Sequence, residues 1–409
     1  MIAAILRFAR DFPGRHGRIM SSGTYVPQID GMRFLAIMQV ALYHAVLRGH
    51  RVMFPGASHS EGPIAYFPNG SAGVELFFFI SGYIIAFPFL SGNAPTLKSF
   101  FKRRFLRLEP PYLLALFLCF LALTASGYRP ADAHSFNKSD AELWQSLMAS
   151  MVYMHGIIFN APPRLNPPLW SLEIEIQFYI LAPLLLAGYM AIRHAASRLV
   201  FGVVILLLAI FSQPFLIADR QINFFLISHF YAFWLGLITC DVALRHNPFD
   251  RTPRRIYDAG LAAGLLLFFW TSALFYALPD PIDNGMNLFA RAISILLIYL
   301  GAARGIFGRW LFSRPWITLI GGACYSIYLI HVPILQASGE VLFHFWQPTS
   351  MLSAWIGSAL LLLPLAVAAG LVYYVFIERF CMRKDWPQRL KEKVLPGRKP
   401  LLGKEAGQP

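Results

Sequence analysis

The chain is 409 residues long, 57% of them hydrophobic and 14% charged, a composition that excludes a soluble globular protein of this size and predicts a polytopic membrane protein. Its formal net charge of +14 does not indicate a nucleic-acid-binding protein, because the basic residues fall in short blocks between apolar runs, which is how membrane topology is encoded. The four cysteines show no CxxC spacing, so neither a disulfide framework nor a zinc site is expected.

Residues 1–27 contain several arginines but no long apolar run with a small-residue cleavage site, so we predict a cytoplasmic N-terminal segment that is not a signal peptide. The first apolar run, about residues 32–48, carries Arg33 and His44. Their spacing of eleven residues is three helical turns plus about 20°, so both side chains lie on one face, about 16 Å apart along the axis. Burying a charged or ionisable side chain in hydrocarbon costs free energy, so such residues inside a membrane span usually mark functional sites. The structural alternative is a salt bridge to another helix.

Ten apolar runs come close to the ~20 residues that a membrane-spanning helix needs. They cover about residues 32–48, 72–90, 110–126, 169–190, 199–218, 224–244, 256–278, 286–303, 316–337 and 353–378. Lysine and arginine concentrate in the N-terminal segment, in the even-numbered connections and after the last run, so both termini are predicted to be cytoplasmic. We expect an all-α membrane domain over residues 28–380 and a basic cytoplasmic tail, residues 381–409, that contacts anionic lipid.

An eleventh apolar stretch, residues 143–159, is left out of this count because spanning there would invert every later basic block. It is predicted to be an interfacial or re-entrant helix. The connection around it, residues 127–168, is the longest one on the predicted outer side and could close over a site that faces outward.

The predicted direction of each helix places a cationic layer near the cytoplasmic side. It consists of Arg33 and of three arginines before the third span, Arg103, Arg104 and Arg107. Guanidinium groups form bidentate, permanently charged contacts to phosphate oxygens, so these arginines could bind a phosphorylated ligand. The structural alternative is ordinary topology signalling, which basic blocks at cytoplasmic helix ends usually provide.

A second, mixed layer is predicted in the outer halves of the helices. It contains histidines, carboxylates and one arginine, namely His44, Glu75, Glu173, Glu175, His229, Arg291 and His331. Imidazoles near carboxylates suit proton transfer, and the alternative is an interhelical hydrogen-bond network. Glu173 and Glu175 are two residues apart on a helix, so at most one of them can point at a given interior spot.

Known motifs for nucleotide and metal binding are absent from the sequence. There is no GxxxxGK[ST] loop and no HExxH pair, and no metal ion is predicted. Gly82 and Gly236 fall inside predicted helices, where they most simply allow close helix approach.

Five stretches, in order, resemble the acyltransferase-3 family of bacterial integral-membrane O-acyltransferases, which act on surface or exported glycans. They are the Arg33 and His44 pair, residues 73–82 (GVELFFFISG), residues 103–107 (RRFLR), residues 170–179 (WSLEIEIQFY) and residues 325–331 (YSIYLIH). The resemblance covers about residues 28–380. The chain departs from the family in lacking the proline that commonly follows the last helix, and we expect no hydrolase-like extracellular domain fused to it.

This resemblance implies ten helices in a bacterial cytoplasmic membrane and transfer of an acyl group, most commonly acetyl from acetyl-CoA, to an acceptor hydroxyl of a glycan or glycolipid. Membrane lipid surrounds such a protein, and a separate extracytoplasmic partner protein could complete the reaction. In the family the first-helix histidine is held essential, while the preceding arginine and the Arg-x-x-Arg pair are linked to the donor. Those roles carry to His44, Arg33, Arg104 and Arg107.

In the hypothesis that follows, the phosphates of coenzyme A are bound by Arg33, Arg103, Arg104 and Arg107, and the pantetheine arm runs along the first helix toward His44. His44 would act as general base or carry the acyl group briefly, and Glu175 or Glu75 would orient its imidazole. The acceptor path is predicted to be lined by Trp170, Ser171, Tyr325, Tyr328 and His331.

Two other functions remain open at this point. A transporter or glycolipid-binding protein would use the same buried charges as a substrate or proton path, although the sequence shows no inverted repeat. A membrane-bound lipid O-acyltransferase of the other intramembrane-histidine type would modify a lipid or protein in place of a glycan.

Overall fold

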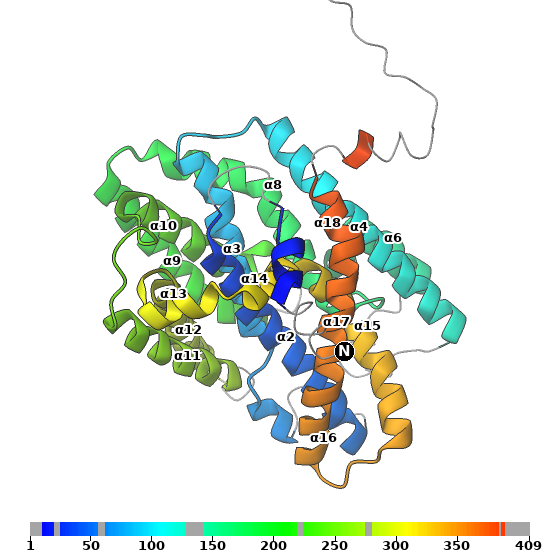
Figure 1. Ribbon diagram of the computed structural model, residues 1–409. Helices are drawn as coiled ribbons and strands as arrows, with labels where there is room; N and C mark the ends of the chain where they lie inside the picture. The colour runs from blue at the N-terminus through cyan, green and yellow to red at the C-terminus, as the bar shows by residue number, and fades with distance from the viewer. Residues whose placement is uncertain are drawn as a thin grey trace, which may run out of the picture.

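The computed structural model describes residues 10–19, 25–55, 62–127, 142–218, 224–274, 280–383 and 386–388. Over these residues the chain forms helices and no strand, as Figure 1 shows. The predicted all-α fold is therefore confirmed. Most of the predicted tail, residues 381–409, and the first nine residues of the predicted N-terminal segment lie outside the described residues.

Nine helical segments in the described part of the chain are long and apolar enough to cross a membrane. They correspond to α3 (Ser71–Leu90), α4 (Leu97–Ser126), α8 (Trp170–Ala191), α9 (Ala195–Ala218), α10 (Phe230–His246), α11 (Ile256–Ala273), α12 (Pro281–Arg304), α15 (Cys324–Phe345) and a last segment of several turns. The remaining predicted span is α2 (Pro27–Met53), a continuous helix of 27 residues. At 1.5 Å per residue it is about 40 Å long, enough to cross a bilayer. A polytopic membrane protein is thus what the structure shows.

The last segment, Met351–Cys381, is not a uniform α-helix. It joins α16 (Met351–Gly357), α17 (Leu363–Tyr373) and α18 (Arg379–Cys381) through two π-helical turns, η5 (Ser358–Leu362) and η6 (Tyr374–Glu378). Single π-helical turns inside helices occur frequently at functional sites, because the extra residue redirects neighbouring side chains. Here the second π-helical turn ends at the fully buried Glu378.

The predicted span over residues 316–337 is wrong in its bounds. The structure divides that stretch into α14 (Pro315–Gly322) and α15, with Ala323 between them. Gly321 lies so close to α2 that a Cβ there would overlap the carbonyl of Asp30. Hydropathy is continuous across this break, so the apolar run alone did not reveal it. As a result His331 lies in the first half of α15, whereas the sequence placed it in the outer half of its span.

The eleventh apolar stretch forms two short helices, α6 (Leu143–Met151) and α7 (His155–Phe159), neither of which is long enough to cross a bilayer. Tyr153 between them has a positive φ of 58°, which breaks the helix. Burial lowers the pKa of His155 in α7 to about 4, so this imidazole is neutral at ordinary pH. The neighbouring residues 128–141 of the same connection lie outside the described residues.

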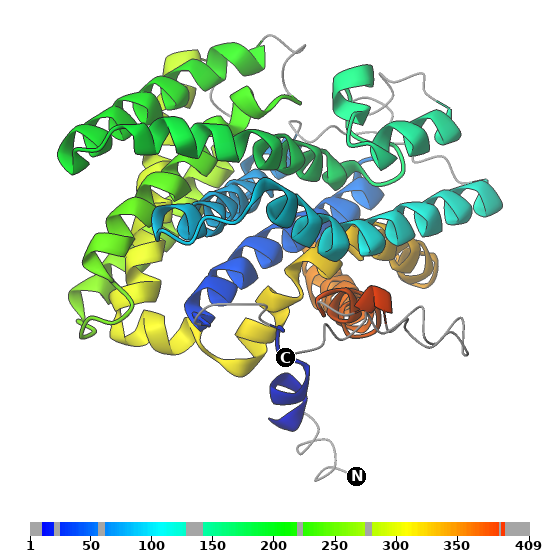
Figure 2. The ribbon, with the colours of Figure 1, turned by 90° about the horizontal axis from the view of Figure 1, so that it is seen from above.

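Helix α2 occupies the centre of the bundle. Figure 1 shows α3 and α10 on one side of it and α15 and α17 on the other, and contacts join α2 to α3, α14, α15 and α16. The N-terminal segment, residues 10–19, lies on the same side of the bundle as α14 in Figure 2, and Phe12 stacks on Trp316 with ring centroids 5.9 Å apart. This position brings Arg18 to the N-terminal end of α2.

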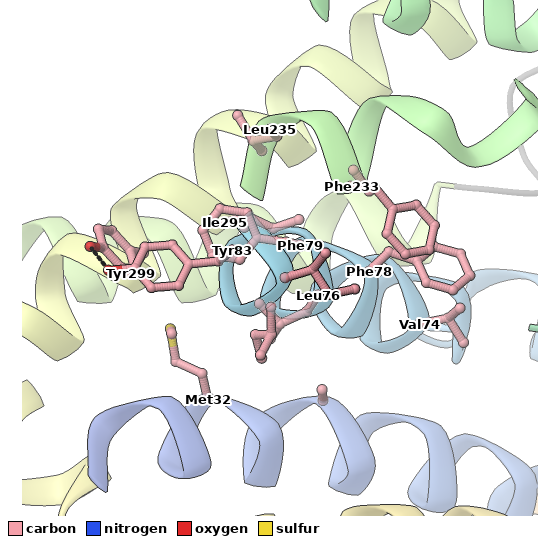
Figure 3. Packing of buried hydrophobic residues seen from close by; sticks show 14 of the residues in the cluster. Met32, Val74, Leu76, Phe78, Phe79, Tyr83, Phe233, Leu235, Ile295 and Tyr299 are labelled. Atoms are coloured by element: carbon pink, nitrogen blue, oxygen red, sulfur yellow. Dashed lines mark hydrogen bonds between the residues drawn. The ribbon is translucent and has the colours of Figure 1, made fainter. Parts of the chain in front are cut away.

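Helices α3 and α10 pack at van der Waals distance through two glycines. A Cβ on Gly82 would overlap the carbonyl of Phe233, and a Cβ on Gly236 would overlap the carbonyl of Phe79. Figure 3 shows the aromatic side chains that fill the space beside this contact, including Phe78 stacked on Phe233 with centroids 4.4 Å apart. The two glycines thus allow the close helix approach that the sequence suggested.

We expect Gly236→Ala to lower the stability of the folded protein, because the added methyl group must push α3 and α10 apart. Overpacking of this kind costs about 1–3 kcal/mol. The measurement is the thermal unfolding midpoint of purified protein in detergent. Gly188→Ala in α8 is the matched control, since a Cβ there meets nothing within 4 Å. Equal midpoints for the two variants would show that the glycine contact is dispensable.

Candidate active site

The first-helix histidine meets a second histidine across the interface between α2 and α15. The Nδ1 atom of His44 lies 3.0 Å from the Nε2 atom of His331, and the ring centroids are 5.1 Å apart. His331 is fully buried, while His44 is half-buried. Two residues that are 287 positions apart in the sequence therefore form one hydrogen-bonded imidazole pair.

Two of the predicted acceptor-path residues lie next to this pair. The Tyr328 ring is 5.6 Å from that of His331. Its hydroxyl is 2.6 Å from the Ser171 hydroxyl and donates to the Pro168 carbonyl at 2.7 Å. Ser171 lies in the first turn of α8, so α8 and α15 are joined by hydroxyl groups beside the imidazoles. A row of polar groups thus runs from His44 through His331 to Tyr328 and Ser171.

The other two acceptor-path candidates contact different parts of the protein. Trp170 faces His229 with ring centroids 5.2 Å apart. Tyr325 donates a hydrogen bond to the Leu108 carbonyl of α4 at 2.8 Å. Trp170 therefore packs on His229, while its neighbour Ser171 contacts Tyr328. Tyr325 connects α15 to the arginine-rich end of α4.

The carboxylates predicted to orient His44 bind other groups. Glu175 accepts hydrogen bonds from the Ser81 hydroxyl, at 2.7 Å, and from Tyr179. Glu75 forms a buried ion pair with Arg291 at 2.8 Å, which joins α3 to α12. Glu173 accepts from the Gly156 amide at 2.8 Å and so connects α8 to α7.

As the two-residue spacing implies, Glu173 and Glu175 face different surroundings.

The cationic layer is built at the N-terminal ends of α2 and α4. Arg33 contacts Asp30 at 2.7 Å, and Arg18 contacts the same carboxylate oxygen at 2.8 Å. Burial alone would lower the pKa of Arg18, but the adjacent Asp30 carboxylate holds it above its ordinary value. Asp30 is only 2% exposed, so it gathers two guanidinium groups in a largely dehydrated place. We call these three residues, together with Arg104, Arg107 and Glu378, the arginine cluster.

The arginines of α4 differ in their surroundings. Arg104 lies over the Phe100 ring at 4.2 Å and the Tyr179 ring at 4.9 Å. Arg107 lies 3.8 Å from Glu378, whose other oxygen accepts from the Ser326 hydroxyl at 2.6 Å. Arg103, by contrast, is exposed and donates to the Ser99 carbonyl of its own helix. Arg104 and Arg107 therefore face the interior, and Arg103 faces outward.

The arginine cluster carries more positive than negative charge. Four guanidinium groups stand against three carboxylates, those of Asp30 and Glu378 and that of Glu175 near Arg104. Within the described part of the chain, the buried Nε atoms of Arg104 and Arg107 have no hydrogen-bond partner, and neither do Oδ2 of Asp30 and Oε1 of Glu378. Buried polar groups are normally hydrogen-bonded, so unused donors in a cationic site indicate a place for an anionic ligand.

Sequence reasoning missed three members of this cluster. Asp30 had a local signal, since it precedes Arg33 by three residues on one helix. Arg18 and Glu378 had none, because tertiary packing and a π-helical turn bring them in from the two ends of the chain. Among the described residues, no group of three or more histidines, cysteines and acids could hold a metal ion.

The chain is similar in sequence to known proteins over most of its length. A family model described as an acyltransferase domain matches residues 26–375. The chain is 26% identical over 379 residues to the proposed membrane-bound transacylase BcsY of Komagataeibacter xylinus, covering 90% of this chain and 86% of that relative. It is also 26% identical over 348 residues to O-acetyltransferase OatA of Staphylococcus aureus, covering 77% of this chain and 51% of OatA. The chain thus spans about half the length of OatA. No solved structure matches it.

Proposed function

Because the chain belongs to the acyltransferase-3 family, we propose that it moves an acyl group, acetyl in the simplest case, from a cytoplasmic acyl-CoA to a hydroxyl of a cell-surface or exported glycan on the outer side. It is a multi-pass membrane protein and an acyltransferase of the O-acetyltransferase type. The donor, the direction of transfer and the acceptor belong to the proposal, as does a bacterial cytoplasmic membrane with both termini inside. The observation that carries it is the continuous helix α2, with the arginine cluster at one end and the imidazole pair further along.

The arginine cluster is suited to the phosphates of the donor. Coenzyme A carries several phosphate charges, and the cluster offers excess guanidinium groups with unused buried donors. Asp30 and Glu378 would hold Arg33 and Arg107 in position before the donor arrives. Such preorganisation lowers the entropy cost of binding.

The distance along α2 fits the extended part of the donor. Arg33 and His44 are eleven residues apart on an uninterrupted helix, which is about 16 Å. A pantetheine arm in an extended conformation has a length of this order, so a donor bound by its phosphates near Arg33 would present its thioester close to His44. Both side chains are at most partly exposed, Arg33 at 13%, as residues that face the protein interior should be.

In the proposed reaction His44 carries out one proton transfer. Its imidazole would take the proton from the acceptor hydroxyl while that oxygen attacks the thioester carbonyl. Collapse of the tetrahedral adduct would break the carbon–sulfur bond, and the proton would pass to the departing thiolate. In the two-step variant a ring nitrogen of His44 attacks the thioester, the carbon–sulfur bond breaks, and coenzyme A leaves as the thiol with the proton that the imidazole gives up. The acceptor hydroxyl then attacks the acyl-imidazole, the carbon–nitrogen bond breaks, and the hydroxyl proton returns to the imidazole. Ser171 and Tyr328 would hydrogen-bond the incoming sugar hydroxyl.

The test is release of free coenzyme A from labelled acetyl-CoA by the purified protein in the presence of surface polysaccharide from the same host. We expect release to depend on the polysaccharide and the label to appear in it as base-labile ester. A transporter or a glycolipid-binding protein would leave the thioester intact. Label recovered in lipid or protein instead of polysaccharide would contradict the proposed acceptor while leaving acyl transfer in place.

A further inference from the structure

The hydrogen bonds of His331 fix where its proton lies. Its Nδ1 atom is 2.9 Å from the Tyr328 carbonyl oxygen and 3.1 Å from the Ile327 carbonyl oxygen. A carbonyl oxygen can only accept a hydrogen bond, so Nδ1 must carry a proton. In the neutral ring the other nitrogen, Nε2, then holds a lone pair and can only accept.

This assignment determines the tautomer of His44. The Nε2 atom of His331 lies 3.0 Å from Nδ1 of His44, and a hydrogen bond between them needs one proton. Since His331 supplies the lone pair, Nδ1 of His44 supplies the proton. The lone pair of neutral His44 is therefore on Nε2, which is the nitrogen that can act as base or nucleophile.

The contact between α2 and α15 is also held in register near this pair. Arg48 of α2, one turn beyond His44, forms an ion pair with Glu340 of α15 at 2.8 Å. Gly339 leaves room for that arginine, since a Cβ there would come 2.7 Å from its Nε atom. On the other side, the hydrogen bonds of Tyr328 fix α15 to the start of α8. His331 is thus a rigid, fully buried acceptor for His44.

We infer that His331 is a positioning residue, which holds His44 as the Nδ1–H tautomer with its reactive lone pair on Nε2. This inference rests on the role of His44 in the proposed function and gives His331 a different role from the acceptor-path one expected from sequence. A neutral imidazole here does the orienting that a carboxylate does in other base-assisted sites, without adding a negative charge to the membrane interior.

Two variants of His331 separate orientation from simple packing. His331→Leu keeps an apolar side chain of similar bulk but offers no acceptor, so kcat should fall about 100-fold while KM for acetyl-CoA stays within about twofold. His331→Gln presents a side-chain carbonyl oxygen that can accept from His44 Nδ1, and it should recover at least tenfold of that loss. Equal kcat for the two folded variants, or a loss confined to KM, would overturn the positioning role.

A second measurement reads the tautomer without relying on activity. Nitrogen-15 NMR of histidine-labelled protein, with His44→Ala used to assign the signals, should show a protonated Nδ1 and an unprotonated Nε2 for His44. In His331→Leu this preference should weaken. A His44 signal with its proton on Nε2 in the wild-type protein would refute the inference. The predicted tautomer combined with full activity of His44→Ala would leave the pairing intact and reject the proposed function.

Discussion

Replacing His44 by alanine is expected to abolish acyl transfer while leaving the protein folded. His44 is the half-buried member of the imidazole pair, and its proposed role is to take the proton of the acceptor hydroxyl or to carry the acyl group. Loss of a general base alone typically costs 10²- to 10⁴-fold in rate, about 3 to 5 kcal/mol in the activation free energy. If His44 also carries the acyl group, the loss is larger.

The measurement is acetyl-ester formation in membranes that contain equal amounts of wild-type and variant protein. His344→Ala is a suitable control, because His344 is exposed near the end of the same helix α15 that carries His331. Elution as a single species in detergent would show that His44→Ala is folded. Turnover at the wild-type rate by folded His44→Ala would remove the chemistry proposed for this site.

Replacing Arg104 by alanine is expected to weaken donor binding strongly and affect the chemical step less. A charge-assisted hydrogen bond to phosphate contributes about 1.5–3 kcal/mol, so KM for acetyl-CoA should rise roughly 10- to 100-fold. Arg104 is a cleaner choice than Arg107, because its described contacts are with the rings of Phe100 and Tyr179. Truncating Arg107 would leave the buried carboxylate of Glu378 uncompensated and so reduce stability as well.

Arg104→Lys should recover only part of the affinity, since an ammonium group keeps the charge but not the bidentate geometry. Arg193→Ala, at an exposed arginine in the connection between α8 and α9, controls for the general loss of a positive charge. Saturation kinetics in acetyl-CoA gives kcat and KM separately. An unchanged KM in Arg104→Ala, or an equal increase in Arg193→Ala, would argue against donor binding by the arginine cluster.

The helical architecture could be predicted from sequence because the properties that define it are local. Apolar length identifies a span, and basic blocks orient it, so each of the ten predicted spans has a helical counterpart in the structure. The Arg33 and His44 relationship could be predicted for the same reason, since helical geometry alone fixes it. The break at Ala323 could not, because both sides of it are apolar and the close contact of Gly321 with Asp30 beside it is a tertiary one.

The partners of the site residues depend on tertiary contacts and were predicted less well. A carboxylate was the reasonable expectation for orienting His44, yet the group that the structure places at its Nδ1 is the imidazole of His331. Glu75 and Glu175 have their own partners in Arg291 and Tyr179. Arg18 and Glu378 lie outside the region that the family model matches, and no spacing in the sequence connects them to Arg33 or Arg107.

In the proposed function, one membrane helix connects a donor site at the cytoplasmic face with chemistry nearer the outer side. The most direct test of this arrangement is the sidedness of donor use in sealed membrane vesicles, because acetyl-CoA does not cross a bilayer. Inverted vesicles, which expose the Arg33 end of α2, should release coenzyme A and accumulate acetylated glycan inside, whereas right-side-out vesicles should do neither until permeabilised. Equal use of external acetyl-CoA by intact right-side-out vesicles would contradict the account.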